Sequence, residues 1–124
     1  MDEQFKVRQF MTDVKHLDLP SKPTLPGELH GILCTKLITE EFTELQVAVA
    51  HRDLTEIAHE LADLLYVCYY MANAYGFIME PIFSEVHRAN MTKAGGPLSL
   101  EGKLLKPPDF EPADVASIIV EQSK

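Results

Sequence analysis

The fold of this chain is set by residues 36–76, KLITEEFTELQVAVAHRDLTEIAHELADLLYVCYYMANAYG. Apolar side chains recur at helical spacing on both sides of a short turn at residues 51–53, so the stretch reads as two consecutive helices. Asp53 has the character of an N-cap for the second helix, with Glu56 three residues later as in a capping box. Gly76 is a suitable residue to end that helix. The sequence therefore predicts a helical hairpin.

Each predicted helix of the hairpin carries acidic side chains at the spacing of one helical turn. Glu40, Glu41 and Glu44 belong to the first helix, and Glu60 and Asp63 to the second. Ionised carboxylates repel one another and are costly to bury unless they are paired or bind a metal. If the two acidic faces pack together they need a cation, and hard divalent ions such as Mg²⁺ or Mn²⁺ prefer oxygen ligands. The alternative is two solvent-facing acidic patches, the usual location of helical glutamate.

The motif Glu-Glu-x-x-Glu at residues 40–44, followed by Glu-x-x-Asp at residues 60–63, resembles the MazG-like, all-α nucleotide pyrophosphohydrolases. The resemblance continues through EVHRANMTK at residues 85–93 and a Gly-Lys…Lys-Pro tail at residues 102–107. It implies an all-α fold, a bundle of four to five helices that oligomerises through its helices as a homodimer or a dimer of dimers. It also implies hydrolysis of a (deoxy)nucleoside triphosphate to the monophosphate and pyrophosphate, as a nucleotide-pool cleaning enzyme. The related phosphoribosyl-ATP chemistry stays open as a branch.

The resemblance assigns a role to each matching residue. The expected Mg²⁺ ligands, with Mn²⁺ as a substitute ion, are Glu41, Glu44, Glu60 and Asp63. Either Glu40 or Glu41 is expected to activate the attacking water. Asn90 and Lys93, three apart on a further helix, are expected to contact phosphate oxygens, a task that suits the point charge of lysine. Weaker candidates for substrate binding are Lys36, Arg88, Lys103 and Lys106.

One position departs from the motif of the relatives, many of which carry an arginine where this chain has Cys34. Lys36 or His30 is the candidate replacement. Two other classes of protein stay open: a catalytically silent helical dimerisation or regulatory module, and a di-iron bundle. Glu56-x-x-His59 has the spacing of di-iron bundles, but that class requires a second such motif and the chain has none.

The remaining segments are expected to surround the hairpin. A first helix is predicted over residues 2–17, with Phe10, Val14 and Leu17 on one face, followed by a proline-rich extended loop at residues 19–27. Further helices are predicted over residues 28–50, 54–75, from 80 to about 93, and 112–121, with a long Gly/Pro-rich loop after residue 93 that is either functional or disordered. The second half of the helix over residues 54–75 is apolar nearly all round, which points to a partner subunit.

Length and charge bound the domain organisation and the partners. The 124 residues are expected to form one domain, with an N-terminal helix and loop (1–27), catalytic helices (28–93) and a loop with a C-terminal tail (94–124). The formal net charge of −8 argues against polymeric nucleic acid and membranes as partners, because both select basic surfaces. The N-terminal residues lack the apolar segment of a signal peptide, so the cytoplasm is the expected location.

Overall fold

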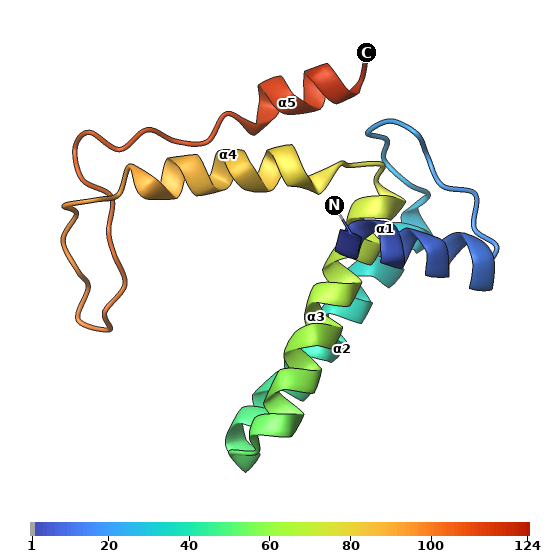
Figure 1. Cartoon of the computed structure of the whole chain (residues 1–124), viewed down its shortest axis with the longest axis horizontal. Coiled ribbons are helices and arrows are strands. Elements are labelled where there is room, and N and C mark those ends of the chain that lie inside the picture. The colour runs from blue at the N-terminus through green and yellow to red at the C-terminus, as the bar shows by residue number, and fades with distance from the viewer. Residues whose placement is uncertain (1) are drawn as a thin grey trace. The chain divides into compact units, whose positions relative to one another are not determined.

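The computed structural model describes residues 2–124, and its regular secondary structure is helical (Figure 1). Its helices are α1 (Asp2–Gln9), α2 (Glu28–His51), α3 (Leu54–Ala74), α4 (Met79–Met91) and α5 (Val115–Gln122), with a π-helical turn, η1 (Phe10–Val14), directly after α1. Residues 2–124 contain no strand, so the expected all-α class is confirmed. None of the helices in this described part is long and apolar enough to cross a membrane. The chain divides into two compact units, one ending at Ile78 and one beginning at Met79.

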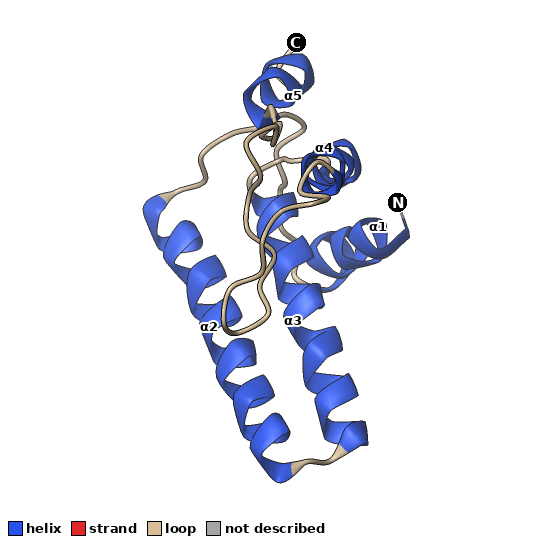
Figure 2. Cartoon of the chain, turned by 90° about the vertical axis from the view of Figure 1, so that its left-hand side faces the viewer, coloured by secondary structure: helices blue, strands red, loops and turns tan. Residues whose placement is uncertain are grey.

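The first unit is built on the hairpin of α2 and α3, which run antiparallel and side by side (Figure 2). Arg52 ends α2 in the left-handed conformation, with φ of 56°. The predicted N-cap is confirmed, because the Asp53 carboxylate accepts hydrogen bonds from the backbone N–H groups of Thr55 and Glu56, at 2.9 and 3.2 Å. The Glu56 carboxylate instead lies 3.0 Å from Nδ1 of His51, so it closes the turn rather than completing the capping box.

The expected single helix over residues 2–17 is wrong in its second half. After Gln9 the chain widens into η1, where the N–H of Lys15 donates to the carbonyl of Phe10 at 3.2 Å, five residues back. This wider turn changes which side chains face inward: Met11 is fully buried, whereas the predicted inward residue Val14 is 63% exposed. A 3.6-residue periodicity contains no sign of a π turn, and so the predicted face was displaced. Leu17 does pack against the core.

The core of the first unit lies at one end of the hairpin, where α1 packs against α3. Its buried members are Val7, Met11, Cys34, Tyr70 and Ala74. Buried amide groups join the same two helices, since Gln4 Nε2 donates to Asn73 Oδ1 at 3.0 Å and Asn73 Nδ2 donates to the Gln4 carbonyl at 3.2 Å. Among residues 35–69, Ala48 alone is buried. Most of the hairpin therefore has little core within its own unit.

The proline-rich loop folds back onto the C-terminal end of α3. The N–H of Thr24 donates to the carbonyl of Tyr75 at 2.9 Å, just after the helix ends. Gly76 follows with φ of +73°, and a Cβ at this position would lie 2.1 Å from the carbonyl oxygen of Lys22. Both the backbone conformation and the close approach of the loop therefore require glycine here.

Substitution of Gly76 by alanine is expected to lower the free energy of unfolding by about 2–3 kcal/mol, because a positive φ and a clash with the loop backbone add together. The control is Gly95→Ala, which shares the positive φ of +82° but has nothing within 4 Å of the new Cβ. That variant should lose only about 1 kcal/mol. Urea unfolding followed by circular dichroism measures both, and equal losses would contradict the close approach at Gly76.

The second unit consists of α4, α5 and the loop between them. As expected, Pro81 lies in the first turn of α4. Arg88 of α4 forms ion pairs with Glu85 and Glu111, and its Nη2 donates to the carbonyl of Pro112 at 3.0 Å, so it attaches the segment before α5 to α4. The N-cap Asp114 accepts from the Ser117 N–H at 3.1 Å, and α5 begins at Val115, three residues after the predicted start.

Part of the loop between α4 and α5 folds as a narrow hairpin. From the sequence, this loop is expected to be either functional or disordered. Leu98 and Leu104 form an isolated antiparallel bridge, and the N–H of Leu105 donates to the carbonyl of Pro97 at 2.7 Å. Gly96 permits this approach, since a Cβ there would lie 2.0 Å from the Leu105 carbonyl oxygen. Lys103 and Lys106 therefore lie on a folded segment.

Candidate active site

Carboxylates from α2 and α3 converge in the half of the hairpin that lies beyond the core. The group consists of Glu41, Glu44, Glu60 and Asp63, here called the acidic cluster. Each residue offers one oxygen, and these four oxygens all lie within 4.8 Å of one another. Antiparallel pairing sets residues 41–44 of α2 beside residues 60–63 of α3, and the spacing of three residues directs both members of each pair to the same side. The structure thus brings together all four residues that were expected to bind the metal.

Two oxygens of the acidic cluster are buried without a hydrogen-bond partner in the described residues. They are Oε2 of Glu41 and Oε2 of Glu60. A buried, unpaired carboxylate oxygen is costly, and four carboxylates at this separation repel one another strongly. A proton or a cation relieves both effects. Four carboxylate donors with two unsatisfied oxygens match the preference of a hard divalent cation, so the residues present fit such an ion.

The electrostatics of the cluster raise the affinity of its carboxylates for protons. Burial, followed by the neighbouring Glu44, raises the pKa of Glu41 from 4.5 to about 7, and Asp63 and Glu60 add to the effect. The pKa of Glu60 is raised by burial, by hydrogen bonding to Glu44 and by the charges of Glu44 and Asp63, while His59 opposes the shift. Without a cation, the cluster therefore holds protons at a pH where isolated carboxyl groups have lost them.

The other candidates on α2 have different environments. Glu40 is exposed and is not part of the acidic cluster, so of the two candidates for activating water only Glu41 is a member. Lys36 is also exposed. Cys34, at the position where the resemblance predicts an arginine, is fully buried in the core, and burial raises the pKa of its thiol. His30 packs edge-on against Tyr70 with 6.1 Å between ring centres, and its buried Nε2 has no partner in the described chain.

The expected phosphate-binding residues belong to the second unit. Asn90 is exposed near the end of α4, and Lys103 is exposed in the loop hairpin. The ammonium groups of Lys93 and Lys106 lie 6.0 and 5.0 Å from the centre of the Phe110 ring, so one aromatic side chain gathers two of the predicted lysines. Sequence reasoning missed Phe110, because a single aromatic residue in a loop carries no periodic signal. Arg88 is committed to its ion pairs with Glu85 and Glu111.

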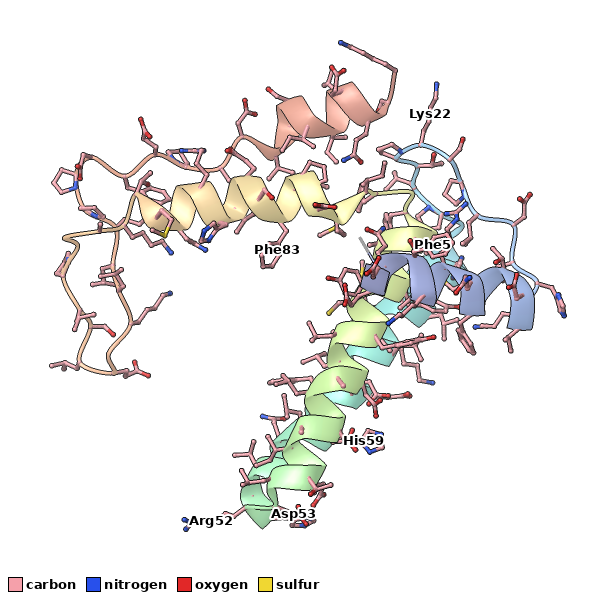
Figure 3. The ribbon with its side chains drawn as sticks, viewed as in Figure 1. Phe5, Lys22, Arg52, Asp53, His59 and Phe83 are labelled. Carbon is pink, nitrogen blue, oxygen red and sulfur yellow. The ribbon has the colours of Figure 1, made fainter. Side chains whose placement is uncertain are left out.

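Sequence reasoning also missed a contact to the acidic cluster from His59. Its Nε2 lies 3.3 Å from Oδ2 of Asp63, one helical turn further along α3. Figure 3 shows the ring projecting from the side of α3. The di-iron hypothesis pairs this histidine with Glu56, but the Glu56 carboxylate contacts His51 instead. The two residues of the Glu-x-x-His motif therefore do not contact each other: Glu56 pairs with His51, and His59 pairs with Asp63.

A hairpin with Glu-Glu-x-x-Glu on one helix facing Glu-x-x-Asp on the next defines the MazG-like, all-α nucleoside triphosphate pyrophosphohydrolases, and the chain is a member of that superfamily. The family model described as phosphoribosyl-ATP pyrophosphohydrolase matches residues 7–90, more than half of the chain. The chain therefore belongs to the phosphoribosyl-ATP pyrophosphohydrolase family. No individual curated protein matches it significantly.

Family membership carries two general consequences. The chain belongs with pyrophosphohydrolases that act on nucleotide-like substrates, and enzymes of this type are typically dependent on a divalent metal. The matched residues include the whole acidic cluster and end at Asn90, before Lys93 and the loop that carries Lys103 and Lys106.

Proposed function

We propose that this chain is a Mg²⁺-dependent pyrophosphohydrolase. Its substrate is a (deoxy)nucleoside triphosphate, which it splits to the monophosphate and pyrophosphate, and its role is the removal of unwanted nucleotides in the cytoplasm. The observation that carries the proposal is the convergence of four carboxylates, with one oxygen of each within 4.8 Å of the others, of which Glu41 and Glu60 each have a buried oxygen without a hydrogen-bond partner. Membership of the phosphoribosyl-ATP pyrophosphohydrolase family supports the type of bond that is broken.

The proposal assigns roles to the candidate residues. The acidic cluster holds the metal, which when bound neutralises phosphate charge and lowers the pKa of a bound water. We assign acceptance of the water proton to Glu41 rather than Glu40, because only Glu41 belongs to the acidic cluster. From the resemblance we assign contacts with phosphate oxygens to Asn90 and Lys93, and to Lys106, whose ammonium group lies, like that of Lys93, beside the Phe110 ring.

Exposed apolar side chains on α3 support an oligomer. Leu54, Leu61 and Leu65 are 83%, 48% and 56% exposed, and the exposed Cys68 continues their row. Their spacings of seven, four and three residues define one stripe along the helix, as at a helix–helix seam. A second copy of the chain is the occupant we propose, since the hairpin has little core of its own between residues 35 and 69. The assembly would be a homodimer or a dimer of dimers.

Replacing Leu61 by lysine is expected to dissociate this oligomer, because a charge would be buried at the centre of the stripe. Analytical ultracentrifugation should give at least twice the monomer mass for the wild-type chain and the monomer mass for the variant. The Cys68 thiol provides a second readout, since it should react with a thiol reagent faster in the variant. The matched control is Leu100→Lys, at a fully exposed loop position. A wild-type chain that sediments as a monomer at micromolar concentration would contradict the proposed partner.

The experiment that tests the function is pyrophosphate release from a panel of canonical and damaged (deoxy)nucleoside triphosphates together with phosphoribosyl-ATP. Each substrate is assayed with Mg²⁺, with Mn²⁺ and with a chelator. Metal-dependent release from a nucleoside triphosphate supports the proposal and ranks the bases and sugars. Release from phosphoribosyl-ATP alone would replace the proposed substrate, and no release from any member of the panel by the folded, metal-loaded chain would refute the activity and favour a silent helical module.

A further inference from the structure

One basic side chain contacts the acidic cluster. His59 places Nε2 at 3.3 Å from Oδ2 of Asp63, four residues further along α3. Across residues 2–124, no other lysine, arginine or histidine nitrogen lies within ion-pair distance of the four cluster carboxylates. Four acidic side chains therefore share a single basic neighbour, and that neighbour touches only one of them.

The contact fixes one side of the Asp63 carboxylate. Nε2 of His59 lies at ion-pair distance from Oδ2, so the imidazole ring lies against one oxygen of the Asp63 carboxylate. A carboxylate has two oxygens, so the contact of His59 with Oδ2 leaves the other oxygen for a cation. Residues that bind metals are commonly oriented by a neighbouring side chain outside the set of ligands.

We propose that His59 is a positioning residue for the divalent cation, acting by holding the Asp63 carboxylate in the orientation that the ion requires. The inference rests on the proposed function, because it assumes that the acidic cluster binds a metal. It goes beyond that function by assigning a role to a side chain outside the set of ligands. His59 sets how tightly the ion binds, whereas the four carboxylates determine that it binds at all.

The exposure of the pair separates this role from a role in folding. The His59 side chain is 72% exposed, and an ion pair between groups this accessible contributes little to stability. The hairpin also provides a matched control, because His51 forms a comparable pair with Glu56 at 3.0 Å with its side chain 59% exposed. The His51 pair lies at the turn and includes no member of the acidic cluster.

The test is Mn²⁺ binding to the full chain in the absence of nucleotide, measured from the electron paramagnetic resonance signal of the free ion. His59→Ala is expected to weaken binding about 10-fold, near the lower end of the range for losing such a neighbour. His59→Gln is expected to restore most of the affinity, since its amide N–H can donate to Asp63. His51→Ala should bind Mn²⁺ as the wild-type chain does, and the metal-free melting temperatures of all three variants should match the wild type.

Equal Mn²⁺ affinity in His59→Ala and the wild-type chain would overturn the inference and leave the proposed function intact. A nitrogen hyperfine coupling on bound Mn²⁺ that is lost in His59→Ala would also overturn it, because His59 would then be a direct ligand. If Mn²⁺ binds and His59→Ala weakens it while no nucleotide is hydrolysed, the positioning role stands and the proposed activity fails. A wild-type chain that binds no Mn²⁺ would overturn both.

Discussion

Asp63→Asn is expected to abolish most of the pyrophosphate release, lowering kcat by about 10²- to 10³-fold. The substitution keeps the size of the side chain but removes one of four negative charges that converge within 4.8 Å. A catalytic metal supplies several kcal/mol of charge stabilisation in the transition state. At about 1.4 kcal/mol for each factor of ten in rate, loss of an ordered metal accounts for the expected decrease. Steady-state pyrophosphate release at saturating substrate, over a series of Mg²⁺ concentrations, measures the change.

The stability of the same variant distinguishes a lost site from a lost fold. Removing one charge from a repelling cluster should leave the metal-free melting temperature unchanged or raise it, so an inactive Asp63→Asn protein will still be folded. Asp109→Asn is a matched control, because Asp109 is exposed in the loop before α5 and lies outside the acidic cluster. Undiminished turnover by Asp63→Asn, with Asp109→Asn also active, would show that Asp63 does not hold the metal.

The sequence contained enough information to predict the hairpin and the grouping of the acidic residues. Asp53, Gly76 and the 3.6-residue repeat of apolar residues are local signals, and each has the predicted effect in the structure. Antiparallel packing then requires that an acidic turn on α2 meets an acidic turn on α3. The misplaced element was the first helix, because the π turn at Phe10–Val14 changes the periodicity on which the prediction depended.

The contacts that the sequence could not show depend on side chains that have no fixed spacing from their partners. Phe110 gathers Lys93 and Lys106 only because the loop folds back, a consequence of the bridge between Leu98 and Leu104 and of the Arg88 ion pairs. His59 could in principle have been found, since it precedes Asp63 by four residues. The Glu-x-x-His motif instead pairs His59 with Glu56, and the choice between Glu56 and Asp63 as the partner of His59 depends on rotamers.

The stability of the metal-free protein is expected to fall as the pH rises from 5 to 8. The folded-state pKa of Glu41 is raised from 4.5 to about 7 and that of Glu60 is raised as well, so in this window the native state binds more protons than the unfolded chain. Stability then decreases with pH until both groups are ionised in the native state. Glu85 and Asp114 have lowered pKa values and act in the opposite sense, but at more acidic pH. Thermal melts in chelator, with Glu41→Gln for comparison, measure this slope, which the variant should reduce.

A divalent cation is expected to reverse this dependence, because it replaces the protons that the cluster loses. At pH 8, Mg²⁺ at about 100 times its dissociation constant should stabilise the native state by about 2.7 kcal/mol, which corresponds to roughly 10 °C in melting temperature for a chain of this size. The gain should shrink at pH 5, where protons compete for Glu41 and Glu60, and should be largely absent in Glu41→Gln. An equal gain in stability at both pH values would place the ion outside the acidic cluster. Only a site that releases protons when it binds the metal makes the gain from Mg²⁺ depend on pH.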